Sequence, residues 1–359
     1  MSQARAPVDL SAFSGPVCVT GASGFIGSHV VRRLLDLGRD VRCLVLPTDE
    51  APLLRGLAVT RVDGDLLDPN ALDRAMDGCE LVLHLAAIYA LWLPEPRLIH
   101  EVNEDGTRAV LSAAKRAGVR RLVHTSSIAA VGTLPGEAPA DETTAFDDWD
   151  IADDYVVSKV LSEREALRPT HRESMDVVVV NPAFPFGARD IGPTPTGKLI
   201  LAMMRGRLPF VASGGFNAVD VRDVAEGHLL AASVGRSGER YLLAGHNLTY
   251  TAFATRVAGL TGGTPPVLSM PRDLLLRLGT LAEFGASLVQ RPPLFTHKSL
   301  AFTAGRHLYF STAKAEAELG YAPGPLDDAL ERAITWFQSD ENPHDIRGIR
   351  EKLRAALAL

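Results

Sequence analysis

The sequence is short of cysteine and has no disulfide or metal-binding spacing. Its 359 residues include 3 cysteines, Cys18, Cys43 and Cys79, which are too few and too scattered for a disulfide framework or a metal knuckle. Cys18 and Cys43 lie in apolar runs typical of strands, so we interpret them as small buried hydrophobic residues. The cysteine pattern excludes a disulfide-stapled fold, and we expect no metal.

Clustered positive charge and long apolar runs are also missing. The chain carries 37 Lys and Arg against 43 Asp and Glu, a net charge of -6, and a sequence-independent grip on nucleic acid needs many clustered cations. The first 14 residues lack an apolar core of signal-peptide length. Residues 274–289 are apolar but are interrupted by Arg277 and Glu283, so they are too short for a membrane span. We expect a cytoplasmic protein with no nucleic-acid partner; residues 274–289 either pack on the rest of the protein or touch a membrane surface.

Short β-branched runs alternate with helical patterns through the first half of the chain. Strands are predicted at residues 17–20, 41–46, 59–62, 81–85, 121–125 and 177–180, and a helix at residues 25–37. Near-continuous apolar strands separated by helices indicate a parallel sheet covered on both faces. The fold class expected is therefore α/β, a doubly wound parallel sheet of the Rossmann type.

Prolines break this alternation after Asn181, and mainly helical patterns follow. Helices are predicted near residues 224–232, 250–260, 271–289 and 326–337, with a late strand at 241–244. We predict that residues 15–182 form mainly the dinucleotide-binding domain. Residues 183–340 are expected to form mainly a smaller C-terminal substrate-binding cap, from which some segments return to the sheet. Residues 341–359 are expected to form a C-terminal helix or tail.

A glycine-rich turn with the spacing G-x-x-G-x-x-G lies directly between the first predicted strand and the first predicted helix. Glycine allows backbone angles that a Cβ forbids and lets amide groups approach a ligand closely, while a helix N-terminus favours a pyrophosphate. In this strand–turn–helix context the turn predicts a dinucleotide site. The residues that we expect to bind the cofactor here are Gly21, Ser23, Gly24, Phe25, Ile26 and Gly27.

The residues after the second and third strands bear on which dinucleotide binds. Asp49 and Glu50 follow the second strand, and no base lies between Arg42 and Arg55. An acid there suits the ribose hydroxyl of NAD, whereas a base suits the 2′-phosphate of NADP, so NAD is favoured and NADP stays open. Asp65 follows the third strand, where it either bonds the adenine amine or serves as a turn or helix-capping residue.

Tyr155, Lys159 and Ser127 form a constellation with a clear chemical logic. Tyr155 and Lys159 are four residues apart on a predicted helix and share one face, and Ser126 and Ser127 end a strand at the carboxyl edge of the sheet. A nearby ammonium lowers the pKa of a phenol from its usual value of about 10. A serine hydroxyl can hold a carbonyl oxygen while the tyrosine transfers a proton and a nicotinamide carries the hydride.

Taken together, these motifs resemble those of the extended short-chain dehydrogenase/reductases. Residues 21–27, 64–68, 84–87 and 103–107 are similar to their nucleotide turn, adenine segment, fourth-strand motif and N-x-x-G-T helix. Within the family, the sequence resembles the dihydroflavonol-reductase-like and 3β-hydroxysteroid-dehydrogenase-like branch. It is also similar to bacterial proteins labelled hopanoid-associated sugar epimerases.

The resemblance implies roles for particular residues. Ser127 would be the catalytic serine and Tyr155 the acid/base, while Lys159 would bind the nicotinamide ribose and lower the pKa of Tyr155. Family members often pair through the helices that match residues 103–118 and 155–166, and for this chain a homodimer and a monomer both stay open. Further cofactor contacts implied by the resemblance are Leu66, Ala86, Ala87 and Pro182.

Apolar residues follow the fourth and sixth predicted strands, and they suit a largely hydrophobic small molecule. The alternative is that they pack the sheet against the cap. The expected substrate-binding residues are Ile88, Tyr89, Trp92, Phe184 and Phe186.

Phe216 bears on the kind of reaction. By resemblance, it occupies the position at which sugar-nucleotide epimerases share an arginine that binds the substrate phosphate. We therefore expect an NAD(P)-dependent oxidoreductase, a ketoreductase that interconverts a ketone and a secondary alcohol. Two alternatives stay open: a sugar-nucleotide epimerase or dehydratase, and a dinucleotide sensor without chemistry.

Overall fold

The computed structural model describes residues 6–90, 93–172, 175–206, 208, 210–266, 268–289, 296–339 and 341, without the side chains of residues 169–172 and 282–289. The predicted tail at residues 341–359 therefore lies outside the described residues, apart from Glu341.

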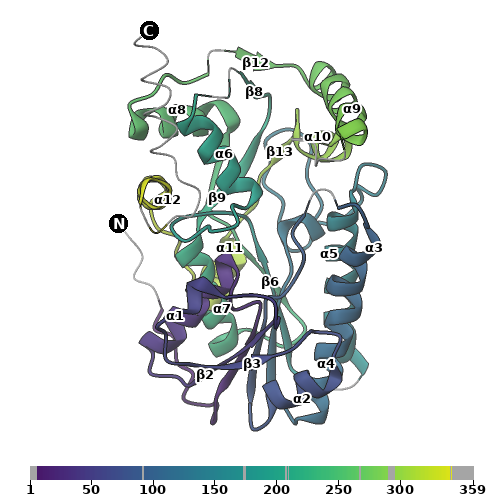
Figure 1. Cartoon of the computed structure of the whole chain (residues 1–359), viewed down its shortest axis with the longest axis vertical. Coiled ribbons are helices and arrows are strands. Elements are labelled where there is room, and N and C mark those ends of the chain that lie inside the picture. Colours follow the sequence, from purple (N-terminus) through teal and green to yellow (C-terminus); the bar gives the residue numbers. More distant parts are fainter. Residues whose placement is uncertain are drawn as a thin grey trace.

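A seven-stranded sheet in the order β10-β6-β5-β4-β1-β2-β3 forms the centre of the described chain, and every neighbouring pair is parallel (Figure 1). This arrangement confirms the predicted doubly wound α/β fold. Strand order reverses between β1 and β4, and ligands of such sheets bind in the crevice beyond the strand ends at this point. Its strands are β1 (Val17–Thr20), β2 (Val41–Val45), β3 (Val59–Asp63), β4 (Leu81–His84), β5 (Arg121–Thr125), β6 (Val177–Pro182) and β10 (Arg240–Leu243).

Helices cover both faces of the large sheet because its central strands are apolar on both sides. One face carries α1 (Phe25–Asp36) and α7 (Val221–Val234), and the other carries α2 (Pro69–Met76), α4 (Gly106–Arg116) and α5 (Asp154–Arg172) (Figure 1). Cys18 and Cys43 are buried inside β1 and β2, which confirms their interpretation as core residues. The short helical segments are η1 (Pro52–Leu54), α3 (Arg97–His100), η2 (Glu101–Asp105) and η3 (Ile128–Ala130).

A second, four-stranded sheet lies beyond the carboxyl ends of the large sheet, and the sequence did not predict it. Its central strand β9 (Gly215–Asp220) pairs antiparallel with β11 (His246–Thr249) and parallel with β7 (Phe184–Phe186) and β13 (His307–Leu308). A separate pair joins β8 (Phe210–Ala212) to β12 (Leu268–Met270). Strands β7, β8, β12 and β13 have 2 or 3 residues each, too few to show a clear period in the sequence.

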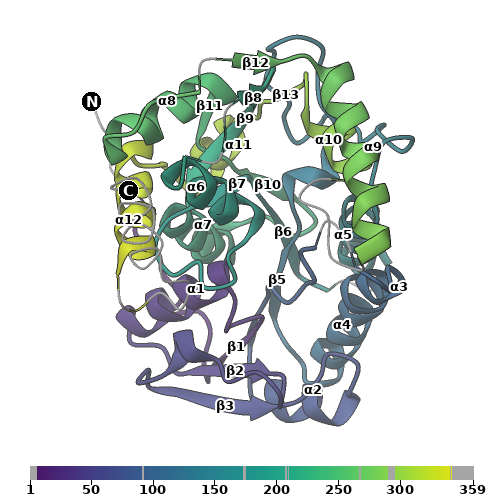
Figure 2. The ribbon, with the colours of Figure 1, turned by 45° about the horizontal axis from the view of Figure 1, so that its top comes forward.

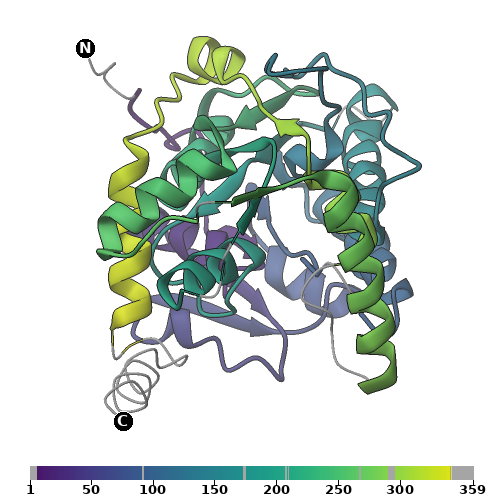
Figure 3. The ribbon, with the colours of Figure 1, turned by 90° about the horizontal axis from the view of Figure 1, so that it is seen from above.

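The remaining helices surround the small sheet, and the views from above place α9 on the side of α5 and place α8 and α12 on the opposite side (Figures 2 and 3). They are α6 (Pro195–Met204), α8 (Tyr250–Thr261), α9 (Arg272–Val289), α10 (His297–Thr303) and α12 (Leu326–Gln338). The late chain also returns to the large sheet, through β10, α7 and α11 (Ala313–Leu319). Helix α9 exposes Leu274, Leu278 and Leu281. Within the described ranges, none of the helices has the length and apolar character that crossing a bilayer requires.

Candidate active site

The glycine turn after β1 has a shape that favours glycine. Gly21 has a φ of +69°, and a Cβ built on it would lie 2.5 Å from the backbone nitrogen of Ala86. The carbonyl oxygen of Gly21 accepts a hydrogen bond from the Gly24 amide at 3.1 Å, and a Cβ on Gly27 would come within 2.0 Å of that oxygen. The turn therefore brings the end of β1, the start of α1 and the segment after β4 together.

The start of α1 can bind an anion. The first amide groups of any helix have no intrahelical acceptor. Gly24 is the N-cap residue and has no side chain that could accept from them, so they are open to a ligand. The helix dipole adds partial positive charge at the same point. Ser23, Phe25 and Ile26 lie beside it and are partly buried. The turn and the helix start therefore fit the pyrophosphate of a dinucleotide.

Asp65 lies in a tight turn after β3. Its Oδ1 accepts a hydrogen bond from the Leu67 amide at 2.8 Å, so Asp65 does shape this turn, and its side chain stays exposed. Leu66 is buried against Gly106 at the start of α4. The side chain of Leu66 thus packs between the turn and α4, while the neighbouring Asp65 offers an exposed polar group.

Two side chains at the end of β2 bear on the choice between NAD and NADP. Leu46 follows β2 directly and is 47% exposed. Arg61 of β3 reaches the same loop, where it donates to the carbonyl oxygen of Asp49 at 2.8 Å and to Asp63 Oδ1 at 2.7 Å. The sequence did not reveal this base, because only the parallel pairing of β2 and β3 brings it beside the end of β2. Its charge is paired with Asp63.

Ser127 and Tyr155 come together beyond the carboxyl end of β5. Tyr155 lies in the first turn of α5, and Ser127 caps η3 by accepting a hydrogen bond from the Ala129 amide at 3.1 Å. The Ser127 hydroxyl lies close enough to the Tyr155 phenol to lower the pKa of the phenol. The Oγ of Ser126, by contrast, is buried without a hydrogen-bond partner in the described part of the chain. The geometry therefore distinguishes Ser127 from its neighbour.

Lys159 lies one helical turn after Tyr155 and is 3% exposed. Its Nζ donates to the carbonyl oxygen of Thr125 at 2.7 Å. Burial lowers the pKa of Lys159 to about 8, and the carboxylate of Glu163 opposes this shift.

The pKa of Tyr155 departs from expectation. Burial raises it to about 12, although the nearby Ser127 hydroxyl opposes this shift. The Lys159 ammonium donates to the Thr125 carbonyl oxygen, and its role in lowering the pKa of Tyr155 stays a prediction. Tyr155 therefore holds its proton at neutral pH.

Asn103 is a site residue to which the sequence analysis gave no role, although the N-x-x-G-T motif contains it. It lies in η2, a turn of π-helix, and such turns are frequent at functional sites. Its Oδ1 accepts from the Ile88 amide at 2.7 Å, and its Nδ2 donates to the Ile88 carbonyl oxygen at 3.1 Å and to Ser158 Oγ at 2.9 Å. Ser158 in turn donates to the Tyr155 carbonyl oxygen at 2.8 Å. Asn103 thus ties the segment after β4 to the helix that carries Tyr155.

The segment after β4 places an aromatic ring beside Tyr155. The rings of Tyr89 and Tyr155 are 4.7 Å apart between centroids with an angle of 46° between planes, and Tyr89 is 38% exposed. In the same segment Ile88 is partly buried and Ala87 is exposed, and Phe184 of β7 is partly buried with its ring 5.4 Å from that of Phe216. Trp92 lies outside the described residues. An exposed apolar surface therefore begins directly next to Tyr155.

Phe186 does not line a surface, which corrects the expectation that it binds substrate, and Phe216 is buried as well. Each is 2% exposed. Strand β7 pairs with β9 and turns Phe186 toward α8, where its ring lies 4.9 Å from that of Phe253. Around Phe216 are the rings of Phe184, Phe186, Tyr250 and Phe253, with centroid distances between 5.0 and 6.1 Å. Position 216 is thus part of an aromatic core, so its side chain does not reach a ligand.

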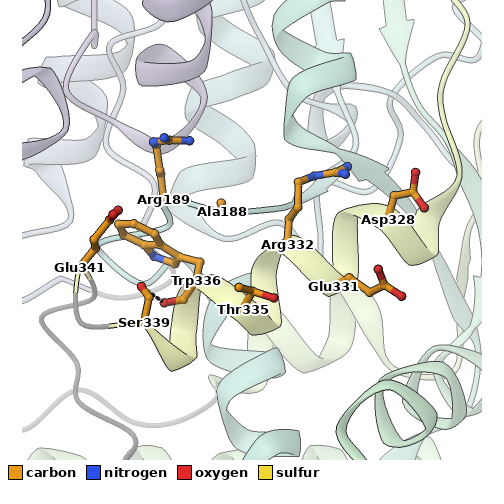
Figure 4. Close-up of a pocket in the computed structure, with 9 residues that line it drawn as sticks. All are labelled: Ala188, Arg189, Asp328, Glu331, Arg332, Thr335, Trp336, Ser339 and Glu341. Atoms are coloured by element: carbon orange, nitrogen blue, oxygen red, sulfur yellow. Dashed lines mark hydrogen bonds between the residues drawn. The ribbon is translucent and has the colours of Figure 1, made fainter.

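A pocket of about 420 Å³ lies elsewhere, between the chain at Ala188 and helix α12 (Figure 4). Arg189 in its wall has a φ of +70°. None of the predicted site residues lines the pocket, and charges of both signs do, so we assign it no ligand. Its charged residues are Arg189, Arg332, Asp328, Glu331 and Glu341.

More than half of the chain matches a known family. The model of the NAD dependent epimerase/dehydratase family covers residues 17–244. This range begins with β1 and ends just beyond β10, so it contains the glycine turn, Ser127, Tyr155 and Lys159.

Individual proteins are similar over nearly the whole chain. Sterol demethylase protein B of Methylococcus capsulatus is 34% identical over 323 residues, which are 89% of this chain and 97% of that protein. The 4-hydroxy-2-methyl-3-oxo-4-farnesyl-3,4-dihydroquinoline-1-oxide ketoreductase of Stigmatella aurantiaca is 30% identical over 308 residues, 85% of this chain and 91% of that protein. The solved structure of gox2253 is 38% identical with a TM-score of 0.81, over 90% of this chain and 98% of that one. The likeness thus includes both sheets.

Proposed function

We propose that this chain, which belongs to the NAD dependent epimerase/dehydratase family, interconverts a ketone and a secondary alcohol on a largely hydrophobic small molecule. Membership confirms the resemblance to extended short-chain dehydrogenase/reductases that the motifs indicated. The chain is accordingly an NAD-dependent oxidoreductase of this family, and the choice of substrate is the part that we propose.

The observation that carries the proposal is the exposed ring of Tyr89 beside Tyr155. An aromatic surface next to the proton-carrying group favours an apolar substrate, because such a surface gains from being covered by apolar atoms. The names of two relatives support this choice, since one is a ketoreductase of a farnesyl-bearing compound and the other a sterol demethylase protein.

We assign the proton transfer to Tyr155. In the direction of reduction, its phenol donates a proton to the ketone oxygen, and a pKa of about 12 ensures that the proton is present at neutral pH. The Ser127 hydroxyl donates a hydrogen bond to the same oxygen as negative charge develops there. Lys159 binds the ribose next to the nicotinamide, in this assignment.

The dinucleotide supplies or accepts the hydride when it is bound. We assign its pyrophosphate to the amide groups of residues 21–27 and its adenine to Asp65, with Leu66 as the support of that turn. Exposed Leu46 brings no charge to a 2′-phosphate and Arg61 is already paired, so NAD is favoured over NADP. Near the nicotinamide we place Ala86, Ala87 and Pro182.

Two other functions make different demands on the site. A sugar-nucleotide epimerase needs a cation for the substrate pyrophosphate, and position 216, where the sequence comparison expects an arginine, is a buried phenylalanine. A dinucleotide sensor needs neither Tyr155 nor Lys159, whereas both are present with Ser127 beside them. The ketoreductase accounts for more of the observed geometry.

Pairing of two copies through α4 and α5 stays a prediction. The two helices lie side by side on one face of the large sheet (Figure 1). Light scattering of the purified protein measures the mass in solution and decides between one copy and two.

The test mixes the purified protein with NADH and a panel of apolar ketones and nucleotide sugars, and follows the near-ultraviolet absorbance of the cofactor. A net loss of NADH with an apolar ketone is the expected result. Conversion of a nucleotide sugar without net loss of NADH would establish the epimerase instead. Binding of NADH with no conversion of any compound would favour the sensor.

A further inference from the structure

A buried carboxylate lies one helical turn beyond Lys159, and no step proposed above uses it. Glu163 on α5 is 5% exposed. Its Oε2 accepts from Asn181 Nδ2 at 2.6 Å and its Oε1 accepts from Arg240 Nη1 at 2.8 Å. Because a buried charge is costly unless it is paired and hydrogen-bonded, these two partners fix the position of the carboxylate.

Asn181 connects Glu163 to Ser127. It lies at the end of β6, and its Nδ2 also donates to the Ser127 carbonyl oxygen at 2.9 Å. The Oδ1 of Asn181 is buried and has no hydrogen-bond partner among the described residues. The orientation of this amide therefore depends on its two donated bonds, one of which Glu163 accepts. Loss of the carboxylate would release the amide and, with it, the backbone that carries Ser127.

Glu163 also supplies negative charge near Lys159. Its carboxylate raises the pKa of Lys159 against the lowering by burial. The pKa values of His84 on β4 and His124 on β5 are lowered, mainly by burial and further by Lys159, so both histidines are neutral at neutral pH. His228 on α7 bonds the Thr125 hydroxyl and is neutral because burial lowers its pKa to about 4, while Asp153 acts on Tyr155. The charge that raises the pKa of Lys159 is that of Glu163.

We infer that the Glu163 carboxylate positions Ser127 and keeps Lys159 charged, an assignment that rests on the function proposed above. Glu163 acts through these two residues, so it is a positioning residue and not a catalytic one. Arg240 holds it from β10 and is itself fixed by two further acceptors, the carbonyl oxygens of Glu142 and Thr144 at 2.7 and 3.2 Å.

The test compares E163Q with R240Q, which break the same ion pair from opposite ends. The measurement is kcat for an apolar ketone as a function of pH, together with the midpoint of thermal unfolding. E163Q is expected to lower kcat roughly 10- to 100-fold, because the groups that meet the substrate shift. It should also move the alkaline limb of the kcat profile to lower pH, since the ammonium loses its counter-charge. R240Q should move that limb to higher pH, because it leaves the carboxylate without its other cation.

The conservative variant E163D separates charge from reach. E163D should lower kcat while it leaves the alkaline limb near that of the wild type. If R240Q does not fold, the comparison of E163D with E163Q by itself shows whether the charge of residue 163 sets the position of the limb. An unchanged limb in E163Q, or shifts of E163Q and R240Q in the same direction, would overturn the assignment.

Failure of the proposed function gives a different pattern. A wild-type protein that reduces no ketone would refute the ketoreductase but leave the role of Glu163 measurable. In that case the readout is the pH dependence of NADH affinity, followed by fluorescence. E163Q and R240Q should shift this dependence in opposite directions if Glu163 sets the charge of Lys159.

Discussion

The carboxyl edge of the large sheet and the interior of the small sheet are built from different kinds of residues. At the large sheet, polar side chains are held by hydrogen bonds, with Lys159 bonded to Thr125 and Asn181 bonded to Ser127. Inside the small sheet, Phe216 is surrounded by aromatic rings. The large sheet therefore orients the reacting groups, while the small sheet provides stability and shape. Substitutions should therefore reduce turnover at the first and stability at the second.

The sharpest test at the large sheet is Y155F, for which we expect the largest effect. Removing the phenol removes the proton donor, so turnover should fall about 1000-fold, within the range known for general acids. The dinucleotide Kd should stay within a few-fold, because the glycine turn is untouched. Steady-state kinetics and fluorescence titration measure the two quantities. Turnover close to that of the wild type would remove Tyr155 from the mechanism.

At the small sheet, F216R should unfold more readily and gain no activity. A buried, unpaired guanidinium in place of a ring costs about 3–5 kcal/mol, so the thermal midpoint should fall by many degrees. F216L is the matched control, since it keeps an apolar side chain and should lose less. A stable F216R variant that converts nucleotide sugars would mean that this position faces a ligand, and the contrast between the two sheets would fail.

Tyr89 lies between these extremes, since it is exposed and packs at a tilt against the ring of Tyr155. Y89A should raise the KM for an apolar ketone about tenfold, as expected when one aromatic contact of about 1.5 kcal/mol is lost. The thermal midpoint should change little, because the ring is not in a core. Y89F keeps the ring and should resemble the wild type. Equal KM values for Y89A and Y89F would show that the substrate does not touch this ring.

The smallest effect concerns the cofactor. L46R places a guanidinium at the exposed end of β2 and should shift the ratio of NADPH to NADH affinity several-fold toward NADPH, in keeping with an exposed ion pair of up to about 1 kcal/mol. L46Q controls for the change in polarity. Titrations at low and high salt measure the ratio, and the shift should shrink at high salt. No difference between L46R and L46Q would place the 2′-position elsewhere.

The sequence predicted the large sheet well because its central strands β1, β4 and β6 are buried along their whole length and are nearly continuous apolar runs. Two strands of the small sheet are very short, since β13 spans 2 residues and β7 spans 3, too few for a period to appear. The burial of Phe186 depends on the pairing of β7 with β9, which local sequence does not reveal.

Long-range contacts also explain what was missed at the site. The approach of Arg61 to the end of β2, the role of Asn103 and the direction of the Lys159 ammonium all arise from neighbours distant in the chain. One signal was available, since Glu163 follows Lys159 by four residues and shares its helix face.

The central claim is a net transfer of hydride between the dinucleotide and an apolar substrate. The most direct measurement supplies NADH deuterated at the transferred position and follows the label by mass spectrometry with an apolar ketone. We predict one deuterium in each molecule of alcohol formed and one NADH oxidised for each. Product that carries no deuterium, or conversion with no net oxidation of NADH, would contradict the account.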